Sequence, residues 1–141
     1  MKSDFDKFAD TVAKIIADGA TGDESIPPVV IGQEPDGTIH TIAMIGIPLN
    51  ATGARAAAIQ AVSRVLKEHK CLRYSFTSEA WAKNPQTGER REIVFIMVVD
   101  KSGFKQLTYQ EIFRKEDKTI DRLGAPTPST IVDSPWAELL S

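Results

Sequence analysis

The segment from Thr77 to Val99 constrains the fold more than any other part of the chain. It reads TSEAWAKNPQTGERREIVFIMVV and ends in seven consecutive apolar residues, Ile93 to Val99. Pro85-Gln-Thr-Gly88 predicts a turn, because proline presets φ and glycine tolerates positive φ. An apolar run of this length, rich in β-branched residues, is typical of a strand covered on both faces. We therefore predict a β-hairpin whose second arm lies centrally in an antiparallel sheet.

Charged and aromatic side chains gather on this hairpin and form the first candidate site for a ligand or partner. They are Glu79, Trp81, Arg90, Arg91 and Glu92. Ion pairs across strands and a guanidinium beside an aromatic ring are common stabilising pairs, worth roughly 0.2–1 kcal/mol each. A purely structural hairpin therefore accounts for this composition. A catalytic site would also need a pocket and a second titratable group or a metal.

Two segments precede the hairpin. Ser3 and the acids after it predict a helix start, and apolar residues then recur at helical spacing, which indicates a helix over 4–18. Glu34-Pro-Asp-Gly37 predicts a second hairpin, with arms at 29–31 and 38–47. The second arm is apolar on both faces, so we expect it to be central or covered twice.

A second helix follows Pro48-Leu-Asn-Ala-Thr-Gly53, and strands are expected near 71–81, 89–99, 104–114 and 119–123. This order predicts an α+β fold with an antiparallel sheet of five to six strands, in the order α-β-β-α-β-β-β. We expect both helices mainly on one face. The chain does not alternate strand and helix, so we expect no nucleotide site of the doubly wound kind.

The length of 141 residues predicts a single domain, 1–141. It comprises the amphipathic helix at 4–18, the α+β body at 29–123 and a proline-rich tail at 124–141. The tail ends in Trp136-Ala-Glu-Leu-Leu140, which we expect to dock on the body or on a second subunit.

Bulk properties favour a cytoplasmic protein. Apolar residues make up 42% and charged residues 26% of the chain, as in ordinary folded domains. A single cysteine, Cys71, excludes an internal disulfide and fits a reducing compartment. We expect no signal peptide. We also expect no membrane span, because the longest apolar run has seven residues and falls far short of the roughly 20 that a bilayer requires.

Charge is unevenly distributed although the net charge is only −2. Residues 1–36 are acidic overall and residues 50–91 are basic overall. The basic residues are Arg55, Arg64, Lys67, Lys70, Arg73, Lys83, Arg90 and Arg91. Nucleic-acid binding is not favoured, because few aromatic residues are left for base stacking and the usual motifs are missing.

The remaining candidates are weaker. His69-Lys-Cys71 spans a helix-to-strand junction, so its thiol and imidazole are not expected to meet, and Cys71 is interpreted as a structural residue. His40 and His69 lie 29 residues apart and match no zinc spacing, so the sequence predicts no metal and no cofactor. A helix start at Asn50, Thr52 and Gly53, with Arg55 nearby, is a candidate anion site.

Four short segments resemble a set of small uncharacterised bacterial and phage proteins. They are Ser78-Glu-Ala-Trp81, Arg90-Arg-Glu92, Asp100-Lys-Ser-Gly103 and Trp136-Ala-Glu-Leu-Leu140. The resemblance covers roughly 55–140, and the loop at 83–88 is shorter here than in that pattern. It implies a similar fold and a bacterial or phage origin, and it carries over no catalytic residue.

Three functions remain open at this stage. The leading hypothesis is a non-enzymatic binding or assembly protein, acting as a homodimer through apolar surface. The second is a small hydrolase or transferase that uses Glu79 with Arg90 or Arg91 on an anionic substrate. The third is a nucleic-acid-associated regulator that uses the basic residues of 55–91.

Overall fold

The predicted hairpin forms the centre of an antiparallel sheet. A computed structural model of the chain describes residues 2–130 and 134–140. Strand β3 (Arg73–Lys83) pairs with β4 (Arg90–Asp100), and β4 pairs with β5 (Lys105–Arg114). The second arm, β4, therefore has a neighbour on each side, as its apolar run predicted.

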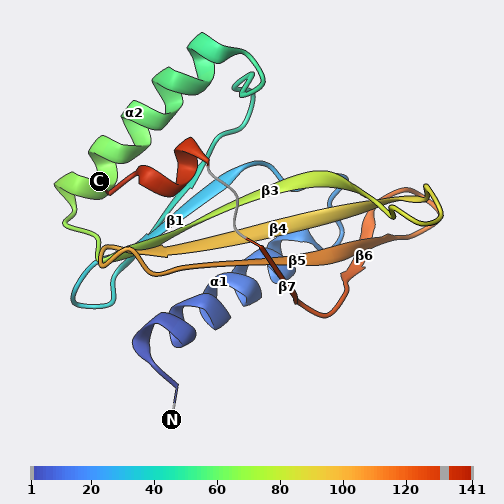
Figure 1. Cartoon of the computed structure of the whole chain (residues 1–141), viewed down its shortest axis with the longest axis horizontal. Helices are drawn as coiled ribbons and strands as arrows, with labels where there is room; N and C mark the ends of the chain where they lie inside the picture. Colours follow the sequence, from blue (N-terminus) through green and yellow to red (C-terminus); the bar gives the residue numbers. More distant parts are fainter. Residues whose placement is uncertain (1, 131–133, 141) are drawn as a thin grey trace.

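Shorter strands extend the sheet on both sides. They are β1 (Val29–Gln33), β2 (Ile39–Ala43), β6 (Ile120–Leu123) and β7 (Thr127–Ser129). The sheet order is β2-β1-β3-β4-β5-β6, and β7 pairs with another part of β5 (Figure 1). The predicted α+β class with an antiparallel sheet is confirmed, with one strand more than the five to six expected.

The helices pack on opposite faces of the sheet. They are α1 (Asp4–Ala20), α2 (Thr52–Glu68) and the short 3-10 helix η1 (Pro135–Glu138). Helix α1 lies on one side, and α2 and η1 lie on the other (Figure 1). The expectation that both helices cover mainly one face is therefore wrong. Strand β4 is apolar on both of its faces, so each face needs its own cover.

Alternate residues of β4 contribute to two separate cores. Val94, Ile96 and Val98 pack with α1, whose buried residues are Phe5, Phe8, Val12, Ile16 and Ala20. Met97 and Val99 pack on the other face with α2, whose buried residues are Ala58, Val62 and Leu66. The start of α1 is as predicted, because the Ser3 side chain accepts a hydrogen bond from the Asp6 amide.

Strand β2 meets one of the two expectations for it, cover on both faces, but it is shorter than the predicted arm at 38–47. It lies at one edge of the sheet and not in the centre, although it is covered on both faces. Ile39 packs against the core under α1, and Ile42 packs against the core under α2. The strand ends at Ala43, so Ile45 and Ile47 lie in the following loop with 76% and 40% of their surface exposed.

The C-terminal segment docks on the body of its own chain. The Trp136 ring stacks on Phe76 with centroids 4.3 Å apart and planes 4° from parallel. Ser63 of α2 donates a hydrogen bond to the Leu139 carbonyl oxygen at 2.6 Å. The segment thus lies on the body, one of the two predicted docking places. Residues 131–133 and 141 of the predicted tail lie outside the described residues.

Candidate functional site

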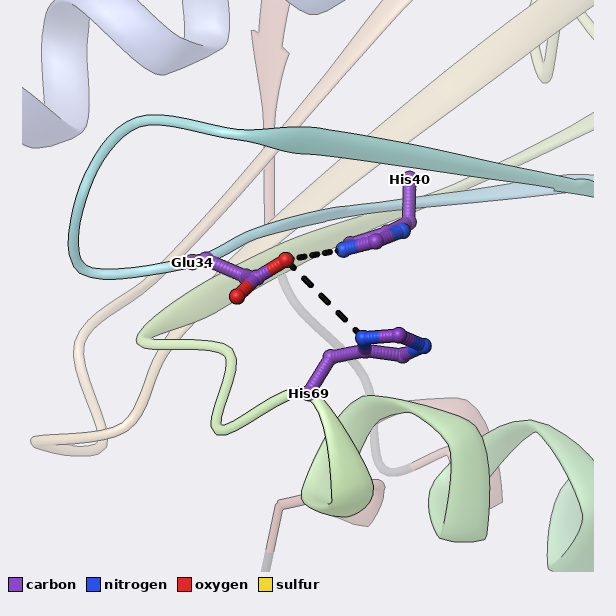
Figure 2. Close-up of side chains that lie close together, drawn as sticks. All are labelled: Glu34, His40 and His69. Atoms are coloured by element: carbon purple, nitrogen blue, oxygen red, sulfur yellow. Dashed lines mark hydrogen bonds and ion pairs between the residues drawn. The ribbon is translucent and has the colours of Figure 1, made fainter.

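Glu34, His40 and His69 form a group of three metal-binding side-chain types whose candidate ligand atoms lie within 4.8 Å of one another. Glu34 follows β1, His40 lies in β2 and His69 ends α2, as Figure 2 shows. Glu34 Oε2 contacts His40 Nε2 and lies 3.9 Å from His69 Nδ1. The two imidazole rings stack with centroids 4.0 Å apart and planes 31° from parallel.

The turn between β1 and β2 places Glu34 and His40 on the same face. Gln33 pairs with Ile39, so Glu34 lies opposite Thr38 and diagonal to His40. The Glu34 amide donates a hydrogen bond to the Thr38 carbonyl oxygen at 2.9 Å, and Gly37 donates to the Glu34 carbonyl at 2.9 Å. Gly37 has φ of 93°, the positive φ for which a glycine is needed.

The end of α2 brings His69 to this hairpin. The Cys71 amide donates to the Leu66 carbonyl and the Lys70 amide to the Lys67 carbonyl, each at 3.0 Å. These two bonds form a Schellman motif, in which Lys70 takes the left-handed position with φ of 56°. Glycine usually occupies that position, since a side chain there costs about 1 kcal/mol. The chain adopts this unfavourable conformation at Lys70, directly after His69.

Gly32 allows α2 to lie close to the sheet at this point. A Cβ atom at residue 32 would lie 2.5 Å from Leu66 Cδ2 and 2.9 Å from Cys71 Sγ. Cys71 is buried, and burial together with the nearby Glu34 carboxylate raises the pKa of its thiol. A thiol of raised pKa stays protonated and is a poor nucleophile, which agrees with the structural role predicted for it.

The five predicted hairpin residues do not share one face. Glu79, Trp81, Arg90 and Glu92 lie on the α1 face of the sheet, whereas Arg91 lies on the α2 face. Arg91 cannot join the others, because it alternates with its neighbours along β4.

Their contacts lie within the chain, and their role as a ligand or partner site stays a prediction. The Arg90 guanidinium lies 5.0 Å from the Trp81 ring, which is 60% exposed, and Arg114 donates to Glu92 at 2.6 Å. Glu79 accepts a hydrogen bond from the Ile26 amide and so ties the loop before β1 to β3. Arg91 donates to Glu111 at 3.1 Å on the other face.

Arg91 and Glu111 line a wide, open depression of about 610 Å³ at the β3–β4 turn. Its other lining residues include Lys83, Asn84, Ile93 and Tyr109. The predicted enzyme would need Glu79 beside Arg90 or Arg91. Arg90 shares the face of Glu79, whereas Arg91 lies on the opposite face of the sheet.

The candidate anion site lies at the start of α2. The N-cap residue is Ala51, and its side chain makes no capping hydrogen bond. Thr52 and Gly53 form the first helical positions and are exposed, with Asn50 just outside and Arg55 partly buried. These four residues stay a prediction for an anion site.

Comparisons of the chain with protein-family models, curated proteins and solved structures found no match. The resemblance to small uncharacterised bacterial and phage proteins therefore stays a prediction. Among the described helices, none combines the length and apolar character needed to cross a membrane.

Sequence reasoning missed the Glu34, His40 and His69 cluster. The proximity of Glu34 and His40 could be predicted from the sequence, because these residues flank a predicted turn at positions that share a face. The position of His69 could not be predicted in this way, because it depends on how closely α2 packs on Gly32.

Proposed function

We propose that this protein is a non-enzymatic binding or assembly protein that acts as a homodimer through the outer edge of β2. The observation that carries the proposal is the chemistry of this edge. Its sequence, Ile-His-Thr-Ile-Ala, contains no lysine, acid or proline, the residues that usually prevent edge strands from pairing.

Backbone direction supports pairing at this edge. The Met44 amide donates to the Pro28 carbonyl oxygen at 2.8 Å, so even-numbered residues of β2 form the ladder with β1. Ile39, Thr41 and Ala43 then direct their amides and carbonyls outward. In residues 2–130 and 134–140, no strand pairs with this side of β2.

The opposite edge of the sheet is less suited to pairing. Strand β7 has only three residues and contains Pro128, which lacks a backbone donor. Strand β6 has four residues, including Asp121 and Arg122, which are charged and exposed. Short, charged or proline-containing strands are the usual protection of a sheet edge.

Apolar surface surrounds the free edge of β2. The exposed residues Ile45 and Ile47 follow the strand directly. Ile15 of α1, 37% exposed, lines a groove of about 220 Å³ together with Thr41. Two copies related by a two-fold axis near Thr41 would continue the sheet across both chains and cover these side chains.

Native mass spectrometry with light scattering tests this proposal. We expect the wild-type chain to be a dimer, and Thr41→Lys to be a monomer at the same concentration, because the lysine brings two like charges together at the axis. Gln86→Lys in the exposed β3–β4 turn adds the same charge and should leave the dimer intact. A monomeric wild type, or a dimer unchanged by Thr41→Lys, would contradict the proposal.

Absorbance at 260 and 280 nm, together with any added mass in the native mass spectra at low and moderate salt, tests the two alternatives in the same samples. Nucleic acid retained at low salt and released at moderate salt would favour the regulator that uses the basic residues of 55–91. A retained small anion would favour the hydrolase or transferase, and Glu79→Gln and Arg90→Ala would then be tested for loss of that anion.

A further inference from the structure

We infer that Glu34, His40 and His69 form a binding site for a divalent transition-metal ion of the Zn²⁺ class. This inference goes beyond the proposed homodimer and does not depend on it. It also replaces the expectation from sequence spacing that the chain binds no metal. The chain contains only two histidines, and both lie in this one cluster.

The positions of the ligand atoms support the inference. One nitrogen from each imidazole lies near the same carboxylate oxygen, and the three candidate ligand atoms lie within 4.8 Å of one another (Figure 2). Zinc bonds of 2.0–2.2 Å in tetrahedral geometry place ligand atoms about 3.3 Å apart. To reach this spacing, small side-chain rotations would bring His69 Nδ1 closer to Glu34 and move the contacting Glu34 and His40 atoms slightly apart.

His69 is the ligand with freedom to make this adjustment. Its side chain is 46% exposed, compared with 26% for both His40 and Glu34. At 3.9 Å, His69 Nδ1 is too far from Glu34 Oε2 for a hydrogen bond. An ion bound between these two atoms would contact both of them.

The other two ligands are held more firmly. Glu34 and His40 flank a turn closed by backbone hydrogen bonds, and the Thr38 amide also donates to Asp36 Oδ1 at 2.9 Å. The turn thus fixes the backbone positions of Glu34 and His40, and the contact between their side chains orients both groups before any ion arrives. Such fixed ligands reduce the ordering that metal binding requires.

The donor set favours particular metals. Two imidazoles and one carboxylate suit Zn²⁺, Co²⁺ or Ni²⁺, whereas Mg²⁺ and Ca²⁺ prefer a shell made only of oxygen atoms. Cys71 does not belong to the group, since its sulfur packs toward Gly32. Three protein ligands leave a fourth position to water, in a site that is open to solvent.

A bound ion would connect two elements that are distant in the sequence. Glu34 and His40 belong to the β1–β2 hairpin, and His69 belongs to the end of α2. An ion that binds the folded chain preferentially stabilises it in proportion to its concentration. We therefore expect Zn²⁺ to raise the unfolding midpoint as well as to bind.

The test uses the full untagged chain after chelator treatment, because a polyhistidine tag would bind the same ions. Isothermal titration calorimetry with ZnCl₂ should give one ion per chain. Glu34→Gln, and a double variant His40→Gln with His69→Gln, should each weaken binding by about tenfold or more. Glu116→Gln removes an exposed carboxylate away from both histidines and should bind Zn²⁺ like the wild type.

Proton NMR adds a readout that a structural role would not change. The two histidines give two sets of ring signals, and both sets should shift together up to one equivalent of Zn²⁺. Circular dichroism checks that each variant is folded. A folded wild type that binds neither Zn²⁺ nor Co²⁺ would overturn the inference. Binding that survives the substitutions, or a shift of only one histidine, would also overturn it.

Discussion

The Tyr74 hydroxyl donates a hydrogen bond to the Trp136 carbonyl oxygen at 2.6 Å. It also accepts one from the Leu139 amide at 3.2 Å, so a single phenol holds both ends of the C-terminal turn. Tyr74 is fully buried, and burial raises its pKa to about 12. The tail therefore depends on one side chain of β3 for both of these polar contacts.

Tyr74→Phe should destabilise the protein by about 1–3 kcal/mol, because a buried carbonyl and a buried amide each lose a partner. Urea unfolding at pH 7 measures this loss. The wild type should also lose stability between pH 10 and about 12, because the unfolded chain gives up the phenolic proton first. The Phe variant should lack that component, and an identical alkaline profile in both proteins would contradict the assignment.

The two tryptophans of the chain give a matched pair of substitutions. Trp136 is 6% exposed and stacks on Phe76, whereas Trp81 is 60% exposed on the hairpin. Trp136→Ala should cost about 3–5 kcal/mol of unfolding free energy. Trp81→Ala should cost less than about 1 kcal/mol, mainly through its contact with Arg90.

Chemical denaturation followed by circular dichroism measures the stability of both variants. Each variant keeps a single tryptophan, so its fluorescence reports the environment of the tryptophan that remains. We expect Trp136 to emit at shorter wavelength than Trp81, because its ring is removed from water. Equal losses of stability for the two variants would mean that the tail is not docked on the sheet in solution.

Local patterns predicted most of the secondary structure. The Ser3 cap, the turn at Pro85-Gln-Thr-Gly88 and the apolar run of β4 each depend on residues close in sequence, and each was interpreted correctly. The placement of the helices was wrong, because nothing local in α1 or α2 says which face it covers. The apolar run of β4 did contain that information, since both of its faces needed cover.

The candidate metal site could likewise be predicted from the sequence only in part. Glu34 and His40 lie six residues apart around one turn, so their proximity follows from the predicted hairpin. His69 joins them only because α2 packs closely on β1, and that packing depends on residues far apart in sequence. Spacing rules for metal ligands do not detect a site assembled from a hairpin and a helix end.

Gly32 should be among the least replaceable glycines of the chain. Its position under Leu66 and Cys71 predicts that Gly32→Ala causes overpacking and costs about 1–3 kcal/mol. Gly19→Ala is the matched control, because nothing lies within 4 Å of a Cβ at that helical position. The control should stabilise α1 by about 0.5–1 kcal/mol.

Thermal unfolding of the two alanine variants gives shifts of opposite sign if this packing is correct. Because the same contact positions the end of α2, Gly32→Ala should also weaken Zn²⁺ binding, whereas Gly19→Ala should not. A Gly32→Ala protein as stable as the wild type would mean that Leu66 and Cys71 relax without cost.

The Asp100 carboxylate should make the stability of the fold sensitive to acid. Partial burial is the largest single influence on its pKa and raises it. Hydrogen bonds from Ser102 at 2.9 Å and from Arg73 at 3.2 Å, together with the Arg73 charge, outweigh burial and hold the pKa below its ordinary value of 3.8. The folded chain therefore binds the Asp100 proton less readily than the unfolded chain does. The resulting stabilisation is complete above about pH 4 and is lost as the pH falls through the folded pKa.

Asp100→Asn tests this, because asparagine keeps an acceptor for the Ser102 amide and removes the charge that pairs with Arg73. The variant should be less stable than the wild type at pH 7 by on the order of 1 kcal/mol. The difference should shrink as the pH falls below 4. Asp121→Asn, at an exposed position of β6, serves as the control and should follow the wild-type profile. Urea unfolding midpoints at half-unit steps from pH 7 to pH 2.5 measure the three proteins together. A difference between Asp100→Asn and wild type that stays constant over this range would assign the loss to packing and not to the Asp100 charge.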